Sequence, residues 1–330
     1  MKYKFRFYEE NDYDDLVRLS LLSYQWDCPV TCLSRMEFCR TLERKFSGKR
    51  HGWENTVGMY LDNDKIVACV WNEGSYGGDV FFLFDKKEWA EDRNLIADMV
   101  KYAKTYAAGL KEDGRTRWLN LMVPEWHDTL KEYVVKHGFT ATDWYDSTYV
   151  LPYLDKDKET QFEVQLPEGY RIVDGYETKA DDQAKVHRLS FNYGAENHGT
   201  DHGEEAFLAY RQCEHYDREL DLCIYDEMGR PVAFTTGWFD DKMPYAELEP
   251  LAVVWWERRR GLATALIHEM TNRIRKKYPQ CKGLRGGDQE FYKRLGFECW
   301  GRSNAYYWEA EIIISWEKES EDKRYWENIL

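Results

Sequence analysis

One order of strands and helices occurs twice in this chain of 330 residues, with the two copies about 160 residues apart. In the first copy, an apolar strand at Asp79–Phe84 precedes a long helix at Glu88–Ala108 and another strand. In the second copy, a strand at Tyr245–Val254 precedes a helix at Gly261–Lys277 and a further strand. Strands and helices mixed in this way predict an α/β fold of the α+β type, with a mixed sheet in each copy.

Chain length also favours two domains, because one hydrophobic core rarely serves more than about 250–300 residues. Short similarities mark corresponding places in the copies: Lys65–Ala68 resembles Arg230–Ala233, and a Gly-Phe pair opens a late strand at Phe139 and again at Phe297. We therefore expect domains at residues 1–150 and 169–314, a charged linker at 151–168, and a tail at 315–330 that can form a final helix.

The acidic balance of the chain restricts its partners. The net charge is −14, so a phosphate backbone is repelled, and we expect no nucleic-acid partner. The sequence has no run of about 18 apolar residues, and its first residues carry acids where a signal peptide needs an apolar stretch. We expect no membrane partner and a location in the cytoplasm. A homodimer is one outcome that the sequence leaves open.

Reduced thiols follow from a cytoplasmic location, and eight cysteines are present. The nearest set is Cys28, Cys32 and Cys39, which lacks a CxxC pair or a nearby HxxxH, so we expect no metal site there.

The segment from Leu251 to Leu266 gives the clearest chemical signal. A strand ends near Val254, a turn with three arginines follows, and a helix begins near Gly261. Free amides and the dipole at a helix start attract an anion, and small residues allow a ligand to approach the backbone. Three arginines alone would equally suit a solvated turn, but the strand–turn–helix context favours a site for a diphosphate group.

This segment resembles the signature of the GNAT N-acetyltransferase superfamily, Arg/Gln-x-x-Gly-x-Gly/Ala. Arg258, Gly261 and Ala263 match the signature, and Tyr292 precedes a Gly-Phe pair as a tyrosine often does in that family. The likeness covers most of residues 170–302. One departure is the pair Trp255-Trp256, where the family often has proline and a polar residue, and which should alter the surface of the turn.

The resemblance implies two tandem GNAT-like domains and acetyl-CoA, or another acyl-CoA, as the cofactor. It also implies which residues bind CoA. The backbone of a splayed strand would hold the pantetheine arm, and the following turn would hold the pyrophosphate. These residues are Leu251, Ala252 and Val253 for the arm, and Arg258, Arg259, Arg260, Gly261, Leu262, Ala263 and Thr264 for the pyrophosphate.

The first copy departs from this pattern. After Asp79–Phe84 come acids where phosphates would bind, with no Gly-x-Gly/Ala pair, and Val134 stands at the place of Tyr292. We expect a degenerate copy that does not bind CoA.

Acyl transfer to an amine requires a proton acceptor for the amine and a proton donor for the departing thiolate. Tyr292 is the candidate acid, or alternatively a ring that packs on the cofactor. Glu247 and Glu249 are the candidate bases, because strand alternation puts both on one face and burial raises the pKa of a carboxyl group. Family position favours Glu247, proximity to the thioester favours Glu249, and either could instead bind the substrate amine or a backbone group.

The sequence thus predicts an N-acetyltransferase that moves an acetyl group from acetyl-CoA to a primary amine of a small molecule. Two alternatives are a non-catalytic acyl-CoA-binding or sensing protein and an acyltransferase that modifies a protein target. The polar loop at residues 192–202 is expected to contact the acceptor, and its His198 and His202 are interpreted as solvated loop residues rather than a metal pair.

Overall fold

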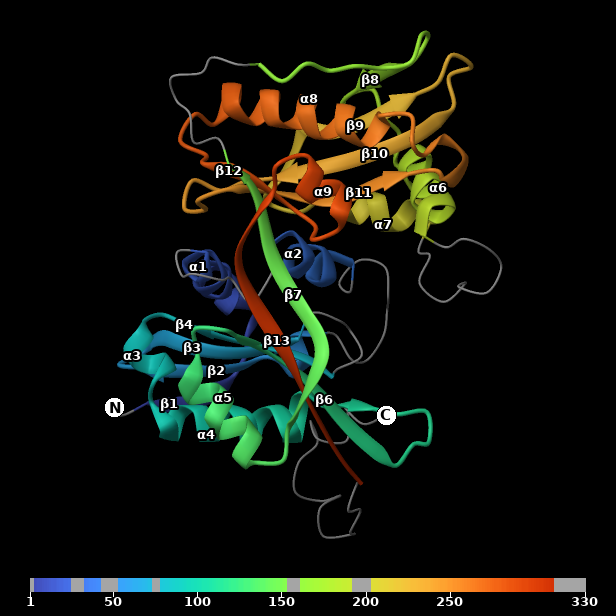
Figure 1. Cartoon of the computed structure of the whole chain (residues 1–330). Helices are drawn as coiled ribbons and strands as arrows, with labels where there is room; N and C mark the ends of the chain where they lie inside the picture. Colours follow the sequence, from blue (N-terminus) through green and yellow to red (C-terminus); the bar gives the residue numbers. More distant parts are fainter. Residues whose placement is uncertain are drawn as a thin grey trace. The chain divides into compact units, whose positions relative to one another are not determined.

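The computed structural model describes residues 3–24, 33–42, 53–72, 78–152, 161–191 and 203–311 (Figure 1). Among them, no helix is both long and apolar enough to span a membrane. The predicted tail, the loop with His198 and His202, Cys28, Cys32 and the side chain of Cys39 all lie outside the described residues.

The chain divides into two compact units, each built from more than one part of the sequence. The N-terminal unit consists of Met1–Thr148 with Trp300–Leu330, and the C-terminal unit is Tyr149–Cys299. Each unit therefore takes strand residues that belong to the other copy of the sequence repeat. This exchange was not predicted, and the duplication boundaries proposed from the sequence stay a prediction.

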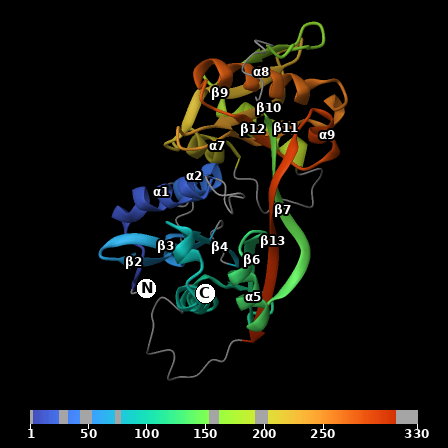
Figure 2. The ribbon, with the colours of Figure 1, turned by 60° about the vertical axis from the view of Figure 1, so that its left-hand side comes forward.

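The N-terminal unit has a mixed sheet in the order β1-β2-β3-β4-β6-β13, with the short β5 paired to β6. Its strands are β1 (Lys4–Phe7), β2 (Gly58–Asp62), β3 (Lys65–Asn72), β4 (Asp79–Phe84), β5 (Gly109–Leu110), β6 (Thr116–Pro124), the first part of β7 (Thr140–Pro152) and most of β13 (Glu298–Glu311). Its helices are α1 (Tyr13–Ser23), α2 (Leu33–Leu42), α3 (Lys87–Ala90), α4 (Arg93–Tyr102) and α5 (Asp128–Lys136). Helix α1 lies on one face of the sheet, and α4 and α5 lie on the other (Figures 1 and 2).

Strand β13 enters this unit by pairing antiparallel with β6, from Ser303 opposite Pro124 to Glu311 opposite Thr116. The core under α4 and α5 is aromatic and aliphatic, with Phe82, Leu95 and Tyr306 among its buried members. Tyr306 comes from β13, so the exchanged strand helps to complete this core, and removing it would expose apolar surface.

The long helix predicted at Glu88–Ala108 is wrong as a single element. The chain forms α3, then α4, and then a π-helical turn at Ala103–Ala107. Asp92 causes the break, because its side chain accepts hydrogen bonds from the amides of Asn94 and Leu95 and so begins a new helix.

In the C-terminal unit the strands of the mixed sheet follow in the order β7-β12-β11-β10-β9-β8, and among the described strand pairs of this unit only β11 and β12 are parallel. Its own strands are β8 (Arg171–Val173), β9 (Tyr216–Tyr225), β10 (Pro231–Trp238), β11 (Ala246–Val253) and β12 (Gly283–Gly286). Its helices are α6 (Ala180–Phe191), α7 (Gly203–Tyr210), α8 (Leu262–Lys277) and α9 (Glu290–Arg294). Helix α8 covers one face of the sheet, and α6 and α7 cover the other (Figure 1).

Residues Tyr149–Pro152 of β7 pair antiparallel with β12 and complete this sheet. The mixed sheets of both units agree with the predicted fold class. The predicted elements around the chemical motif agree closely too, because β11 and α8 begin and end within one residue of the predicted ranges.

Candidate active site

The candidate site lies where β11 parts from β12. The two parallel strands pair only at Ala246 with Leu284 and at Glu247 with Arg285. On its other side, β11 stays paired with β10, but its register shifts between Leu248 and Leu251, which marks a β-bulge. Beyond Glu247, no described strand covers the β12-side edge of β11. This edge includes Leu251, Ala252 and Val253, the residues predicted to hold a pantetheine arm.

Helix α8 begins at the end of this open edge without a side-chain cap. Its N-cap is Gly261, in the left-handed region at φ 83°. The first helical hydrogen bond runs from the Ala265 amide to the Gly261 carbonyl oxygen, 2.9 Å, so the preceding amides have no helical acceptor. A β-carbon on Gly261 would meet no atom within 4 Å. Space is therefore open beside Gly261, at the helix start where the amides of Leu262, Ala263 and Thr264 have no helical acceptor.

The three arginines of the turn have different roles. Arg258 donates to backbone oxygens, through Nη2 to Ser190 at 2.9 Å and through Nε to Val253 at 3.2 Å. Arg260 donates to the buried Glu257 at 2.5 Å and to the Tyr170 hydroxyl at 2.7 Å. Arg259 is exposed, and within the described part of the chain it makes no hydrogen bond or ion pair. Of the three arginines in the turn, Arg259 is therefore the one whose guanidinium is not already bonded to a group of the described chain.

The corresponding place in the N-terminal unit is closed by the chain itself. Strands β4 and β6 also pair in parallel at only two positions, Asp79 with Asn120 and Val80 with Leu121. The following helix α4, however, is capped by the Asp92 carboxylate, which accepts from the Asn94 amide at 2.9 Å and the Leu95 amide at 3.2 Å. A carboxylate occupies the position that a phosphate would need, which supports the interpretation of this unit as a degenerate copy.

The two candidate bases have different surroundings. Glu247 is buried, and its Oε1 accepts from Arg285 Nη1 at 2.8 Å, directly across the β11–β12 pair. Glu249 is only partly buried and lies within the bulge, two residues beyond the last rung that β11 shares with β12. The carboxylate of Glu247 is thus held by a cation, whereas that of Glu249 lies where the strands diverge.

Tyr292 lies on α9, with its ring packed on the backbone of two glycines. A β-carbon on Gly286 would come within 2.6 Å of this ring, and one on Gly287 within 2.8 Å. Burial and the negative charge of Glu249 together raise the pKa of Tyr292. The phenol therefore stays protonated at neutral pH, and the charge of Glu249 contributes to the raised pKa.

Buried side chains hold the bulge, a role that the sequence interpretation did not assign to them. Trp238 and Tyr210 both donate to the carbonyl oxygen of Glu249, the former at 2.8 Å. No local pattern marks these residues. The pair Gly286-Gly287 before α9 is a signal that the sequence does contain, because glycine often marks a place where another group approaches the backbone closely.

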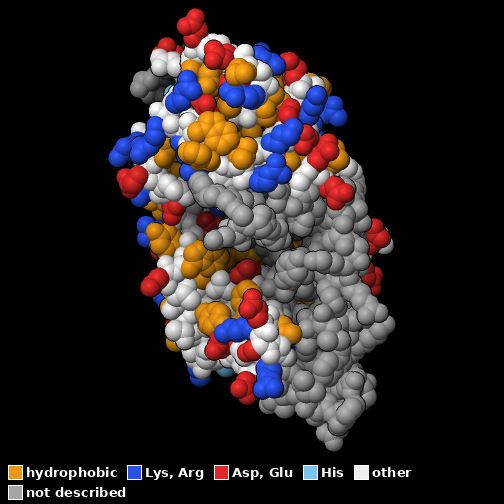
Figure 3. All heavy atoms as spheres, turned by 90° about the vertical axis from the view of Figure 1, so that its right-hand side faces the viewer, with side chains coloured by type: hydrophobic (Ala, Val, Ile, Leu, Met, Phe, Trp, Pro, Cys, Tyr) orange, Lys and Arg blue, Asp and Glu red, His pale blue; other side chains and the backbone are white. Residues whose placement is uncertain are grey.

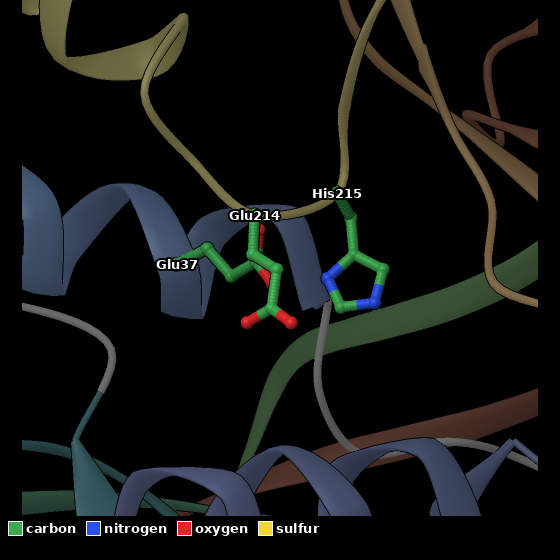
Figure 4. Close-up of side chains that lie close together, drawn as sticks. All are labelled: Glu37, Glu214 and His215. Atoms are coloured by element: carbon green, nitrogen blue, oxygen red, sulfur yellow. The ribbon is translucent and has the colours of Figure 1, made fainter.

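Glu214 and His215 of this unit directly precede β9 (Figure 4). His215 Nε2 is 3.3 Å from Asp240 Oδ2. Glu37, also labelled in Figure 4, belongs to helix α2 of the N-terminal unit.

The C-terminal unit thus combines a mixed sheet, an open strand edge on β11 and an uncapped start of helix α8. The model of the Acetyltransferase (GNAT) family matches residues 185–297, so this part of the chain is a GNAT domain. No curated protein matches the sequence.

Solved structures extend the similarity of fold to nearly the whole chain. A GCN5-related N-acetyltransferase from Sphaerobacter thermophilus has 14% identity and a TM-score of 0.59, with 95% of this chain and 97% of that chain covered. A tandem GNAT protein from the clavulanic acid biosynthesis pathway has 15% identity and a TM-score of 0.61, with 95% and 100% covered. A glucosamine N-acetyltransferase region of a fungal multi-domain enzyme has 12% identity and a TM-score of 0.54, with 93% and 38% covered. The chain has the fold of a tandem GNAT protein.

Proposed function

We propose that the protein is an N-acetyltransferase that transfers an acetyl group from acetyl-CoA to a primary amine of a small molecule. One observation carries the proposal: the C-terminal unit joins an uncapped helix start, an open strand edge, and a phenol that lies under the influence of a partly exposed carboxylate. The N-terminal unit has the same strand order but a filled helix start, so it is proposed to bind no CoA.

The cofactor would be held mainly by backbone groups. The open edge of Leu251–Val253 offers amides and carbonyls to the pantetheine arm, and the amides of Leu262, Ala263 and Thr264 suit the pyrophosphate. Arg258 and Arg260 fix the shape of the turn, and Arg259 contributes charge. Bound acetyl-CoA supplies an acetyl group activated as a thioester.

The residues of the site would then move two protons. Glu249 accepts a proton from the acceptor's ammonium group, directly or through a water molecule, which leaves the amine nitrogen nucleophilic. The amine nitrogen then bonds to the acetyl carbon as the C–S bond breaks, and Tyr292 would give its phenolic proton to the sulfur that leaves. The second proton that the nitrogen loses in becoming an amide restores the phenol. Glu247 and Arg285 neutralise each other beside this site, so we assign Glu247 to holding the strands rather than to proton transfer.

Two other functions would use the same fold: non-catalytic acyl-CoA binding, and acylation of a protein target. The net charge of −14 favours a cationic acceptor and gives weak support to a small amine. Calorimetric titration with acetyl-CoA tests the cofactor site common to all three functions. A thiol-release assay with amines, amino acids and aminoglycosides then separates the enzyme from the binding protein.

The proposal requires thiol release with at least one small amine and a clear loss of turnover in Tyr292→Phe. Two results together would support a sensor and exclude this enzyme. In the first, acetyl-CoA binds but no amine or peptide is turned over; in the second, Tyr292→Phe has no effect. The cytoplasmic location stays a prediction.

A further inference from the structure

Two adjacent tryptophans lie on the surface of the C-terminal unit, directly before the arginine turn. Trp255 is 60% exposed and Trp256 is 48% exposed, and their rings meet edge to face at 5.4 Å. They form the 3₁₀ turn Trp255–Glu257, between β11 and α8. Exposed pairs of such large rings are rare on a protein surface and indicate a binding surface.

The turn that carries these rings is fixed from both sides. The Val254 amide donates to Val232 of β10 at 3.0 Å, and the Glu257 amide donates to Val254 at 3.0 Å. Arg258, next in the chain, is bonded to Ser190 of α6. The two rings are therefore presented on a rigid support, which lowers the entropy cost of ligand binding.

Arg259 follows three residues after Trp256 in an unusual conformation. Its φ is 66°, in the left-handed region that favours glycine. It is exposed, and its guanidinium has no partner in the part of the chain that the structure describes. A long cationic side chain thus stands where glycine would fit more easily, and it is positioned beside the helix start proposed for the pyrophosphate. In Figure 3, basic and hydrophobic side chains adjoin on the exposed surface in the upper part of the view.

We propose that Trp255, Trp256 and Arg259 bind the adenosine 3′-phosphate end of the acyl-CoA. Indole rings stack on purines, and an unpaired guanidinium suits a phosphate dianion. Both features flank the pyrophosphate site, from which the ribose and adenine of CoA extend. The inference rests on the proposed function. It assigns the nucleotide part of the cofactor to three residues, of which Trp255 and Trp256 are a departure from the family pattern.

The stacking half of the inference is tested with a double variant, Trp255→Ser with Trp256→Ser, by calorimetry on the full chain. The two ligands are acetyl-CoA and S-acetyl-4′-phosphopantetheine, which lacks the nucleotide. Stacking of one base corresponds to an affinity gain of about 5- to 150-fold. We expect the double variant to lose about tenfold or more for acetyl-CoA and to bind the truncated thioester like the wild type.

The charge half is tested with 3′-dephospho-CoA. The wild type should prefer CoA to 3′-dephospho-CoA by about two- to fivefold, as expected for an exposed ion pair. Arg259→Gly should remove this preference while relaxing the backbone, and Arg259→Lys should keep part of it. Tyr176→Ser is the matched control, because Tyr176 is 67% exposed in the same unit, and it should change neither affinity.

The outcomes separate this inference from the proposed function. If the wild type binds acetyl-CoA tightly and the tryptophan and arginine variants bind every ligand equally well, the inference is overturned and the cofactor site stands. If the variants change the mass of the protein in solution but not the affinity, the tryptophans form a contact between copies, which also overturns it. If the wild type binds neither thioester, the proposed function itself fails.

Discussion

The indole N–H of Trp238 donates to the carbonyl oxygen of Glu249 at 2.8 Å, and the Tyr210 hydroxyl donates to the same oxygen. Thr235 Oγ1 donates to the next carbonyl, that of Pro250, at 2.8 Å. A bulge interrupts the regular ladder, so its carbonyls need other donors. Buried side chains of β10 and α7 thus fix the backbone that carries the proposed base.

We expect Trp238→Phe combined with Tyr210→Phe to lower kcat about tenfold or more, because each lost bond to a buried carbonyl costs roughly 1–3 kcal/mol and loosens Glu249. The affinity for acetyl-CoA should change less than twofold. Thiol release gives kcat, and calorimetry gives the affinity. Tyr278→Phe is the control, since its hydroxyl contacts Asp217 at 3.1 Å instead. Equal losses in binding and turnover would contradict a positioning role.

The two glutamates of β11 should respond differently to the same substitution. Glu247→Gln removes the countercharge of the largely buried Arg285 and should lower the free energy of unfolding by roughly 1–3 kcal/mol. Glu249→Gln should leave this free energy within about 0.5 kcal/mol and lower kcat strongly at neutral pH. Urea unfolding and thiol release measure the two quantities. The reverse pattern, with Glu247 needed for turnover alone, would make Glu247 the base.

Strand periodicity and the arginine–glycine turn were sufficient to predict β11, α8 and the place of the helix start. Those signals are local, because hydrophobic patterning and helix starts act over a few residues. The distant partners of the arginines were not predictable, since Arg258 bonds to a residue 68 positions away and Arg260 to one 90 positions away. The strand exchange was not predicted for a related reason. Strands β7 and β13 hold equivalent places in the repeat, and no local signal indicates which unit each strand joins.

The pH dependence of turnover tests Tyr292. Burial and the charge of Glu249 raise its pKa, so the protonated phenol persists to higher pH than for a free tyrosine, whose pKa is about 10. We therefore expect no alkaline decline of kcat from this group below about pH 10. Tyr292→Phe should lower kcat about tenfold or more without changing the acetyl-CoA affinity. A decline below pH 9 that disappears in Tyr292→Phe would show a phenol with a lowered pKa.

The stability of the N-terminal unit should depend on His127 in weakly acidic solution. This side chain is buried, its Nε2 lies 2.6 Å from the Ala90 carbonyl oxygen, and it stacks on Trp126 at 4.7 Å. Burial lowers the pKa of His127 to about 4. Between pH 6.5 and 4 the unfolded chain binds a proton that the folded unit does not, so stability falls as pH falls, by up to about 3 kcal/mol.

His127→Gln should flatten this dependence, because glutamine can still donate to Ala90 but does not titrate. Urea unfolding followed by tryptophan fluorescence at pH 7, 6 and 5 measures it. An unchanged slope in His127→Gln would assign the acid sensitivity to other groups.

Helices α4 and α8 offer a matched comparison of a filled and an open helix start. Gly261→Asp would place a carboxylate beside the amides of Leu262–Thr264 and should lower acetyl-CoA affinity about 100-fold or more, since its charge repels the pyrophosphate and several hydrogen bonds are lost. Gly261→Ala is the control, because it adds only the strain of a left-handed backbone, about 1–2 kcal/mol, and so distinguishes that strain from the effect of the carboxylate. Asp92→Ala should cost about 0.5–2 kcal/mol of stability and leave one acetyl-CoA bound per chain. Calorimetry gives affinity and stoichiometry together. A second molecule of acetyl-CoA bound by Asp92→Ala would show that only this carboxylate keeps the N-terminal unit from binding the cofactor.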